Sequence, residues 1–283
     1  MLQPIMHILN TKQIILASGS PRRKQILQNI GMKFDVVPST FEENLNKSEF
    51  AHPSDYVIEN ARLKTLAVAE HFSKQQNILP DLIIGADTVV AMDNKIYEKP
   101  KDQSDAFSML SQFSGRSHMV YTGIVLIMPA SLTGGTLPDD KQFKVIKFFE
   151  STEVIMTKMS PEIINSYINT GEPMDKAGGY GIQGIGGTLV EAIKGDYFNV
   201  MGFPLHRFSR ELSLLYSGHH KRTLSAIGCY PVFIVTLSAI AVLKLQFVFS
   251  GEYLQRGTVE RFGIYNILKW LLVLKRKRWR GLE

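Results

Sequence analysis

Residues 16–23 join the end of one structural element to the start of another. They read Leu-Ala-Ser-Gly-Ser-Pro-Arg-Arg. The apolar, β-branched run before them predicts a buried strand over residues 13–17, and Gly19 allows a tight exit from it. Ser20 is a favoured capping residue and Pro21 a favoured first helical residue, so we expect Ser20 to cap a helix that ends at Gly31. The sequence therefore predicts a strand, a tight turn and a helix start within eight residues.

The first turn of this predicted helix suits an anion. Free backbone amides and the positive end of the helix dipole gather there, and Arg22 and Arg23 add two guanidinium groups. The alternative is a capped surface helix with two solvated arginines. This stretch alone does not separate the two interpretations.

A second predicted strand, over residues 81–92, carries an aspartate at its centre. Asp87 stands between Leu-Ile-Ile-Gly-Ala and Thr-Val-Val-Ala. A buried carboxylate without a partner is costly, so Asp87 should meet a cation, a metal ion or several hydrogen-bond donors. Asp87 is therefore a candidate functional residue. The alternative is a structural aspartate that binds neighbouring backbone amides.

Hydrophobic periodicity and turn residues predict the other elements. Strands are expected over residues 34–38, 96–100, 118–128, 143–158, 189–193 and 197–201. Helices are expected over residues 53–72, 103–113, 161–169 and 204–216, and a loop over residues 130–141. Hairpin turns at residues 93–94 and 195–196 join neighbouring strands, and the first of them places Glu98 and Lys99 roughly opposite the Asp87 region.

Residues 175–184 are unusually rich in glycine and read Asp-Lys-Ala-Gly-Gly-Tyr-Gly-Ile-Gln-Gly. Each interior glycine costs a helix about 1 kcal/mol, so a loop is expected. Glycine lets a backbone approach a ligand closely, Lys176 offers a positive charge, and Gln183 offers both a donor and an acceptor. We interpret the segment as a ligand-lining loop, with a merely flexible loop as the alternative.

Composition limits the partners. With 283 residues, 45% of them hydrophobic, the chain can bury a large core. The formal net charge of the whole chain is +6, and the positive excess lies in residues 218–283, which hold eleven Lys and Arg against three Asp and Glu. Residues 1–217 are slightly acidic, so we expect no nucleic-acid partner.

Cysteine and histidine usage excludes several kinds of site. Cys229 is the single cysteine, so no disulfide within the chain and no cysteine-based zinc cluster is expected. The seven histidines lack the spacing of metal ligands. Residues 1–12 show no secretory signal, and we expect a cytoplasmic protein.

Four motifs together resemble the Maf family of nucleoside triphosphate pyrophosphatases. They are Ser-Gly-Ser-Pro-Arg-Arg, Gly-Ala-Asp-Thr, Glu-Lys-Pro and the glycine-rich segment, in this order. The resemblance covers about residues 13–216 and is strongest to animal members that carry a second, methyltransferase-like domain; residues 218–283 do not resemble that domain. It implies an α/β fold, an elongated mixed sheet flanked by helices, with two lobes and a central cleft. It also implies hydrolysis of a nucleoside triphosphate to its monophosphate and pyrophosphate, with a divalent metal.

The resemblance also implies roles for single residues. Asp87 matches the catalytic acid–base position. Positions for substrate choice match Arg22, Thr88 and Gln183. Polar positions that line the cleft match Ser18, Arg23, Glu43, Lys64, Lys99 and Lys176, and we place Ser20 with the substrate-binding residues. Thr88 and the Gly-Ile-Gln-Gly stretch resemble the branch that acts on dTTP and UTP rather than the one that acts on 7-methyl-GTP.

The residues themselves agree with such chemistry. Asp87 and Glu43 are expected to hold Mg²⁺ or Mn²⁺ and to orient water, because oxygen ligands suit these ions. Whether Asp87 acts as base, metal ligand or both is left open. The alternative function is a non-catalytic nucleotide-binding regulator whose tail binds a membrane or a partner.

The expected boundary lies between a catalytic domain, residues 1–217, and a basic tail, residues 218–283. Residues 223–243 carry no charge and are long enough to cross a bilayer, but Pro231 weakens this interpretation. A membrane anchor, a helix packed on the body and a tail without a selected fold remain open, and we favour the last. The sequence also leaves a homodimer open.

Overall fold

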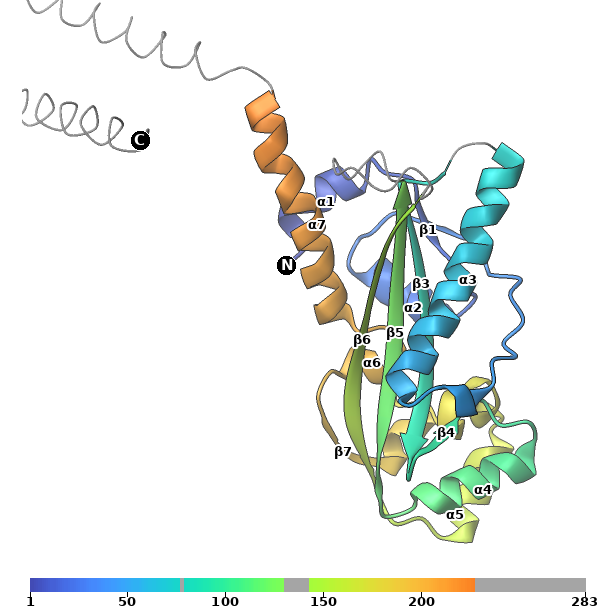
Figure 1. Ribbon diagram of the computed structural model, residues 1–283. Coiled ribbons are helices and arrows are strands. Elements are labelled where there is room, and N and C mark those ends of the chain that lie inside the picture. Colours follow the sequence, from blue (N-terminus) through green and yellow to red (C-terminus); the bar gives the residue numbers. More distant parts are fainter. Residues whose placement is uncertain (77–78, 130–142, 227–283) are drawn as a thin grey trace, which may run out of the picture. The chain divides into compact units, whose positions relative to one another are not determined.

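The computed structural model describes residues 1–76, 79–129 and 143–226 (Figure 1). The predicted loop over residues 130–141, the predicted roles of Cys229 and nearly all of the tail lie outside the described residues. The chain divides into two units after His219, and the architecture below is that of Met1–His219. The boundary expected after residue 217 stays a prediction.

Helices and strands alternate along most of this unit. The helices are α1 (Gln3–Leu9), α2 (Pro21–Asn29), α3 (Pro53–Gln76), α4 (Gln103–Phe113), α5 (Pro161–Asn169), α6 (Tyr197–Val200) and α7 (Leu205–Ala226). The strands are β1 (Ile14–Leu16), β2 (Asp35–Val36), β3 (Leu82–Met92), β4 (Lys95–Tyr97), β5 (Ser117–Pro129), β6 (Phe143–Met156) and β7 (Val190–Lys194). None of the helices in the described part is long and apolar enough to cross a membrane.

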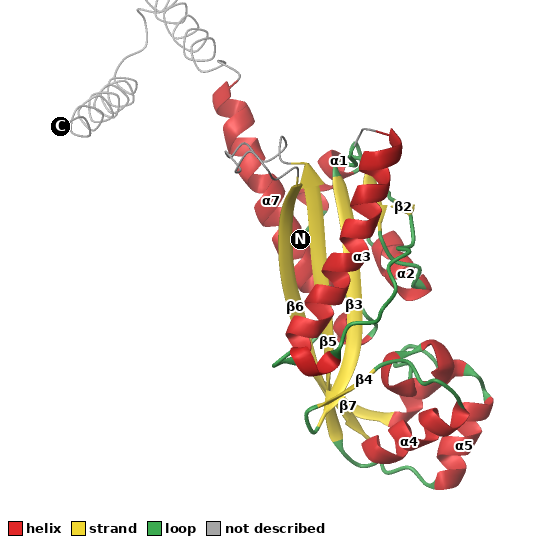
Figure 2. Cartoon of the chain, turned by 45° about the vertical axis from the view of Figure 1, so that its right-hand side comes forward, coloured by secondary structure: helices red, strands yellow, loops and turns green. Residues whose placement is uncertain are grey.

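The strands form one seven-stranded mixed sheet in the order β2-β1-β3-β5-β6-β7, with β4 paired to β3. β1 runs parallel to β2 and β3, and the other pairs are antiparallel. Helices flank the sheet on both faces, so the expected mixed sheet flanked by helices is confirmed (Figures 1 and 2). β3 is buried at every residue except the half-buried Thr88, as its mostly apolar sequence predicts.

Alternation along β3 decides which face each side chain meets. Ile83 belongs to the apolar cluster beneath α3, whereas Ile84 belongs to the cluster beneath α1, α2 and α7. Asp87 lies four residues after Ile83, so its side chain points to the same face of the sheet, toward α3. Thr88 lies four residues after Ile84, so its side chain points to the opposite face, toward α2.

Helix α3 packs unusually close to the sheet because two strand residues lack a side chain. A Cβ on Gly123 of β5 would lie 2.7 Å from the carbonyl of Val57, and one on Gly85 of β3 would collide with Thr65. The contact at Gly123 would be with the backbone of α3, and the contact at Gly85 would be with a side chain on the face of α3 that meets the sheet. The two glycines thus bring α3, with Lys64, against the middle of β3.

A second core forms at the far end of the long strands. There α4, α5 and the glycine-rich segment pack on β3, β5 and β6 around buried aromatic residues, including Phe113, Tyr167 and Tyr180 (Figure 2). We call this end the second lobe, and the end that carries β1, α2 and α3 the first lobe. Asp87 lies on β3 between these two cores.

Most predicted elements are confirmed, several within one or two residues. α4 has the predicted bounds, and the predicted turn at Asp93 and Asn94 joins β3 to β4 with positive φ angles of 51° and 60°. α1 was not predicted. It is seven residues long, and its residues Ile5 and Leu9 are buried in the core of the first lobe.

The strand predicted over residues 197–201 is wrong, because Tyr197–Val200 form the short helix α6. The Asp196 side chain accepts a hydrogen bond from the Phe198 amide at 2.8 Å and caps the helix. Asn199 is fully buried and donates to the Val120 carbonyl and to Thr152 Oγ1. These contacts turn the chain away from β7, so no hairpin forms at residues 195–196.

Candidate active site

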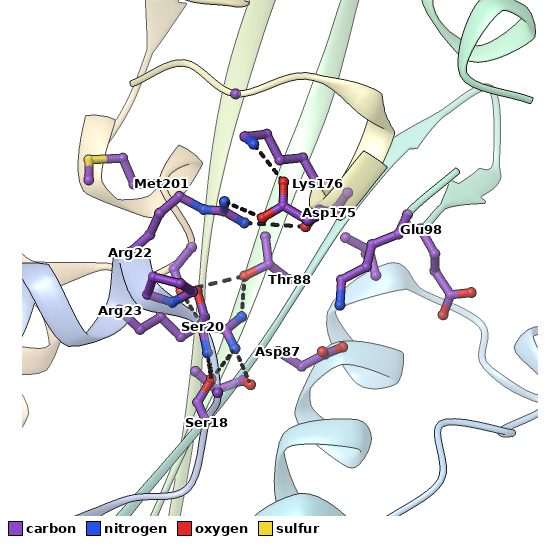
Figure 3. Close-up of a pocket in the computed structure, with 18 of the residues that line it drawn as sticks. Ser18, Ser20, Arg22, Arg23, Asp87, Thr88, Glu98, Asp175, Lys176 and Met201 are labelled. Atoms are coloured by element: carbon purple, nitrogen blue, oxygen red, sulfur yellow. Dashed lines mark hydrogen bonds and ion pairs between the residues drawn. The ribbon is translucent and has the colours of Figure 1, made fainter. Parts of the chain in front are cut away.

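A pocket of about 660 Å³ lies at the meeting of the two lobes (Figure 3). It is lined by every residue that the sequence singled out: Ser18, Ser20, Arg22, Arg23, Glu43, Lys64, Asp87, Thr88, Lys99, Lys176 and Gln183. They come from the β1–α2 turn, the first turn of α2, the loop after β2, α3, β3, the segment after β4 and the glycine-rich loop. The structure therefore brings segments distant in sequence to one place. The roles expected for these residues stay predictions.

The turn between β1 and α2 has the predicted shape but not the predicted cap. Ser20 has the extended backbone of a capping residue, yet its side chain accepts no hydrogen bond from the helix. Instead, the Ser20 amide donates to Ser18 Oγ at 3.4 Å. The first turn of α2 therefore faces the pocket without a side-chain cap. Ser20 thus occupies the predicted N-cap position, but the capping hydrogen bond from its side chain is absent.

Asp87 meets a cation, as a buried carboxylate should. Its side chain is 10% exposed, and its Oδ1 accepts a hydrogen bond from the Lys64 ammonium at 2.7 Å. The same ammonium lies 2.8 Å from Glu43 Oε1. One lysine on α3 thus joins the two carboxylates that the sequence proposed as metal ligands.

Burial and charge act against each other on Asp87. Burial raises the pKa of its carboxyl group, while the positive charges of Lys64 and Arg23 lower it. A raised pKa makes a carboxylate a better proton acceptor near neutral pH. The Lys64 ammonium opposes the effect of burial, because its positive charge favours the ionised carboxylate.

Arg22 and Lys176 face each other across the pocket and share one carboxylate. Arg22 Nη1 donates to Asp175 Oδ2 at 3.0 Å, and Lys176 Nζ donates to Asp175 Oδ1 at 2.6 Å (Figure 3). Arg22 belongs to the first lobe and Asp175 to the second. This contact links the lobes at the mouth of the pocket.

Glu172 fixes the glycine-rich loop. Its carboxylate accepts hydrogen bonds from Tyr167 Oη and from the amides of Ile185 and Gly186, at 2.9–3.0 Å. Lys176 Nζ donates to the Glu172 carbonyl at 2.7 Å. The loop is therefore held by side chains on both sides of its glycines, which favours a formed binding surface over a merely flexible loop.

Arg23 and Thr88 are engaged with the protein. Arg23 donates hydrogen bonds to Ser18 Oγ, to the carbonyls of Ala86 and Gly202, and to Thr88 Oγ1. Thr88 Oγ1 also lies 3.0 Å from the hydroxyl of Thr122. Both side chains line the pocket with most of their hydrogen-bonding capacity already used.

Lys99 and Gln183 differ from Arg23 and Thr88, because their side chains are not engaged with described residues of the protein. Both are exposed in the pocket, and among the described residues neither side chain has a hydrogen bond or ion pair. A bound ligand would meet them without first displacing a protein contact.

Sequence reasoning gave no role to two acidic residues of the pocket, Asp175 and Glu98. Glu98 accepts a hydrogen bond from Tyr56 Oη at 2.6 Å and pairs with Lys47 at 2.7 Å. Each of the two acids directly precedes a lysine that the sequence did single out. That adjacency was the available signal, although it does not say which distant cation each acid binds.

Comparisons with known proteins find one family and several similar proteins. The family described as Maf-like protein matches residues 13–215. A human protein named "Probable bifunctional dTTP/UTP pyrophosphatase/methyltransferase protein" is 46% identical over 217 residues, which are 76% of this chain but 34% of the human protein. The chain thus spans about a third of that relative.

Bacterial relatives are matched over nearly their whole length. A Clostridium perfringens protein named "dTTP/UTP pyrophosphatase" is 46% identical over 71% of this chain and 95% of its own length. A Thermoanaerobacter protein with the same name is 42% identical over 69% of this chain and 92% of its own length.

Proposed function

The chain belongs to the Maf-like protein family, and on that premise we propose that it hydrolyses nucleoside triphosphates to the monophosphate and pyrophosphate. We propose dTTP and UTP as the substrates, because relatives at 41–46% identity carry these nucleotides in their names. The observation that carries the proposal is the buried Asp87 carboxylate, paired with Lys64 in a pocket lined with cations.

Hydrolysis requires a water molecule to attack the α-phosphorus while the bond to the pyrophosphate oxygen breaks. We assign Asp87 the acceptance of the water proton, because its raised pKa and buried position suit a general base. The negative charge that develops on the phosphates is offset by Lys64, Lys99, Arg22 and Lys176, which line the same pocket.

A divalent cation fits the donors present. Asp87 and Glu43 already share one positive charge, the Lys64 ammonium, at 2.7 and 2.8 Å. Among the described residues no group of three His, Cys, Asp or Glu side chains converges on one point. Two carboxylates with water and phosphate oxygens are typical of Mg²⁺ rather than of a closed protein cage. When bound, the ion would polarise the phosphate and lower the pKa of a water.

We propose Gln183 as a contact to the base. Uracil and thymine present an acceptor beside an N–H donor, and one side-chain amide can form hydrogen bonds with both at once. Gln183 is exposed in the pocket and has no side-chain partner among the described residues, so it is available for this contact. Cytosine, whose amino group replaces that acceptor, presents the reversed pattern, so discrimination against it requires the orientation of the Gln183 amide to be fixed in the complex.

We further propose a cytoplasmic enzyme that does not bind nucleic acid. The support is the slightly acidic composition of residues 1–217 and the single cysteine. The homodimer and the role of the tail stay open predictions.

Pyrophosphate release from dTTP and UTP tests the proposal, with Asp87→Asn as the decisive variant. We expect turnover to fall about 10²- to 10⁴-fold, the usual contribution of a general base. Asp93→Asn is a matched control, because Asp93 is exposed, pairs with Arg116 and does not line the pocket. A thermal unfolding curve of each variant checks that the fold is kept.

Other outcomes have clear meanings. Turnover of Asp87→Asn within a few-fold of wild type contradicts the assignment of Asp87. Full activity in excess chelator contradicts the metal. Nucleotide binding by the wild type without pyrophosphate release, with added Mg²⁺ and Mn²⁺, would favour the non-catalytic regulator.

A further inference from the structure

The guanidinium of Arg23 uses four of its five N–H donors within the protein. Nε donates to the Gly202 carbonyl at 2.9 Å, and Nη2 donates to Thr88 Oγ1 at 3.0 Å. Nη1 donates to both Ser18 Oγ and the Ala86 carbonyl at 2.9 Å (Figure 3). An arginine has five such donors, so a single N–H remains for any ligand.

The bond to Ala86 completes the edge of β3. The Ala17 amide, just after β1, donates to the Ile84 carbonyl at 2.8 Å, and there β1 leaves β3. The next carbonyl on that edge belongs to Ala86, two residues further, because carbonyls of a strand alternate in direction. Ala86 is fully buried, and a buried carbonyl requires a donor. Arg23 supplies it in place of a strand amide.

The acceptors of Arg23 lie on both sides of Asp87 in the chain. Ala86 precedes Asp87 and Thr88 follows it, so two bonds of one guanidinium hold β3 around the residue proposed as the general base. Asp87 itself faces α3, where it pairs with Lys64. Arg23 bonds the α2 side of the same strand.

We propose that Arg23 is a positioning residue that fixes β3 at Asp87, and that Arg22 alone of the two adjacent arginines binds the phosphates. The proposal rests on the proposed function. It assigns different roles to two arginines that the local sequence pattern placed together at one helix start, and that the family resemblance assigned to substrate choice and to the cleft lining.

Arg22 has the opposite surroundings. Within the described residues its guanidinium donates to the carboxylate and to the backbone carbonyl of one residue, Asp175, whose side chain is 61% exposed. An incoming phosphate can replace this solvated carboxylate at little cost. Replacing the partners of Arg23 would instead leave carbonyl groups in the interior without donors.

Two matched variants, Arg23→Lys and Arg22→Lys, test the proposal, because both keep the charge and remove the fork of donors. We expect Arg23→Lys to lower kcat for UTP at least tenfold, since small displacements at a reacting centre are costly. Its Kd for inorganic tripolyphosphate should stay within about twofold of the wild-type value. For Arg22→Lys we expect a weaker tripolyphosphate Kd and a higher KM, with kcat largely kept.

The measurements also separate positioning from mere stability. Activity is measured well below the unfolding midpoint and referred to the folded fraction. If Arg23→Lys lowers only the midpoint and keeps kcat per folded molecule, the proposal is overturned. It is equally overturned if Arg23→Lys weakens tripolyphosphate binding as much as Arg22→Lys does.

A second variant covers the case in which Arg23→Lys does not fold. Thr88→Val removes the acceptor of Nη2 with little change in shape and keeps Arg23. It should lower kcat and leave tripolyphosphate binding unchanged, and the reverse pattern refutes the proposal. If the wild type releases no pyrophosphate, the proposed function fails on its own, while the tripolyphosphate comparison of Arg22 and Arg23 still decides whether Arg23 contacts the ligand.

Discussion

Asp175→Asn should tighten the binding of phosphate ligands. The carboxylate of Asp175 holds Arg22 at 3.0 Å and Lys176 at 2.6 Å. Partial burial acts to raise the pKa of Asp175, but hydrogen bonds from Lys176 and Arg22 lower it below its usual value, so the group is charged at neutral pH. A triphosphate that takes up these two cations must first displace Asp175. Asparagine keeps the shape and removes the charge.

The size of the expected change in Kd follows from the exposure of the Asp175 side chain. The Asp175 side chain is 61% exposed, so solvent screens both ion pairs. Exposed pairs contribute about 0.2–1 kcal/mol each, and the two together oppose phosphate binding by about 0.4–2 kcal/mol. The Kd of inorganic tripolyphosphate should therefore fall about 2- to 30-fold in Asp175→Asn.

Titration calorimetry with inorganic tripolyphosphate measures this change. Asp93→Asn is again the control, because Asp93 is 65% exposed, pairs with Arg116 at 2.8 Å and lies outside the pocket lining. Its binding should equal that of the wild type. The gain in Asp175→Asn should shrink as salt is added. Binding by Asp175→Asn that is equal to or weaker than wild type would refute the reasoning, because Asp175 would then orient the two cations in the complex instead of competing with the ligand.

Two further predictions concern the fold. His118 is 3% exposed, its Nε2 lies 2.7 Å from Tyr180 Oη, and burial lowers its pKa from 6.5 to about 4. Below pH 6.5 the unfolded state takes up a proton that the folded state does not, so this group should reduce the free energy of unfolding by about 2 kcal/mol between pH 7 and pH 5. Urea unfolding of wild type and His118→Gln measures it, and equal pH slopes would contradict the assignment. Gly123→Ala should destabilise by about 1–3 kcal/mol, because its Cβ would meet the Val57 carbonyl on the backbone of α3 at 2.7 Å. An unchanged thermal midpoint would show that α3 can move away from the sheet.

Local sequence patterns were enough to predict most of the secondary structure. The apolar run of β3 and the Ser-Pro start of α5 are signals within a few residues, and both gave nearly correct bounds. α1 has no such signal beyond its spaced Ile5 and Leu9, since it depends on contacts with the core of the first lobe. The residues of α6 were misassigned because aromatic and β-branched residues favour strands, whereas the Asp196 cap and the buried Asn199 fix a helix.

The site shows the same division between local and distant information. Motifs identified which residues would meet, and all of them line one pocket. They did not reveal the partners of those residues, because the partners are remote in sequence. Arg22 binds Asp175 across 153 positions, and Arg23 binds Gly202 across 179. The local pattern therefore offered Arg22 and Arg23 as two cations at one helix start, although the fold gives the two side chains opposite surroundings.

The charges that line the pocket argue for a metal independently of the family. The lining includes five cationic side chains, Arg22, Arg23, Lys64, Lys99 and Lys176, and four carboxylates, Glu43, Asp87, Glu98 and Asp175. The pocket thus has only one excess positive charge, and three of its cations are already paired with carboxylates. A nucleoside triphosphate brings several negative charges, which this excess does not balance. Release of Arg22 and Lys176 from Asp175 supplies cations but leaves that carboxylate unpaired. A divalent ion held by Glu43 and Asp87, which now share only the Lys64 ammonium, would supply the missing positive charge.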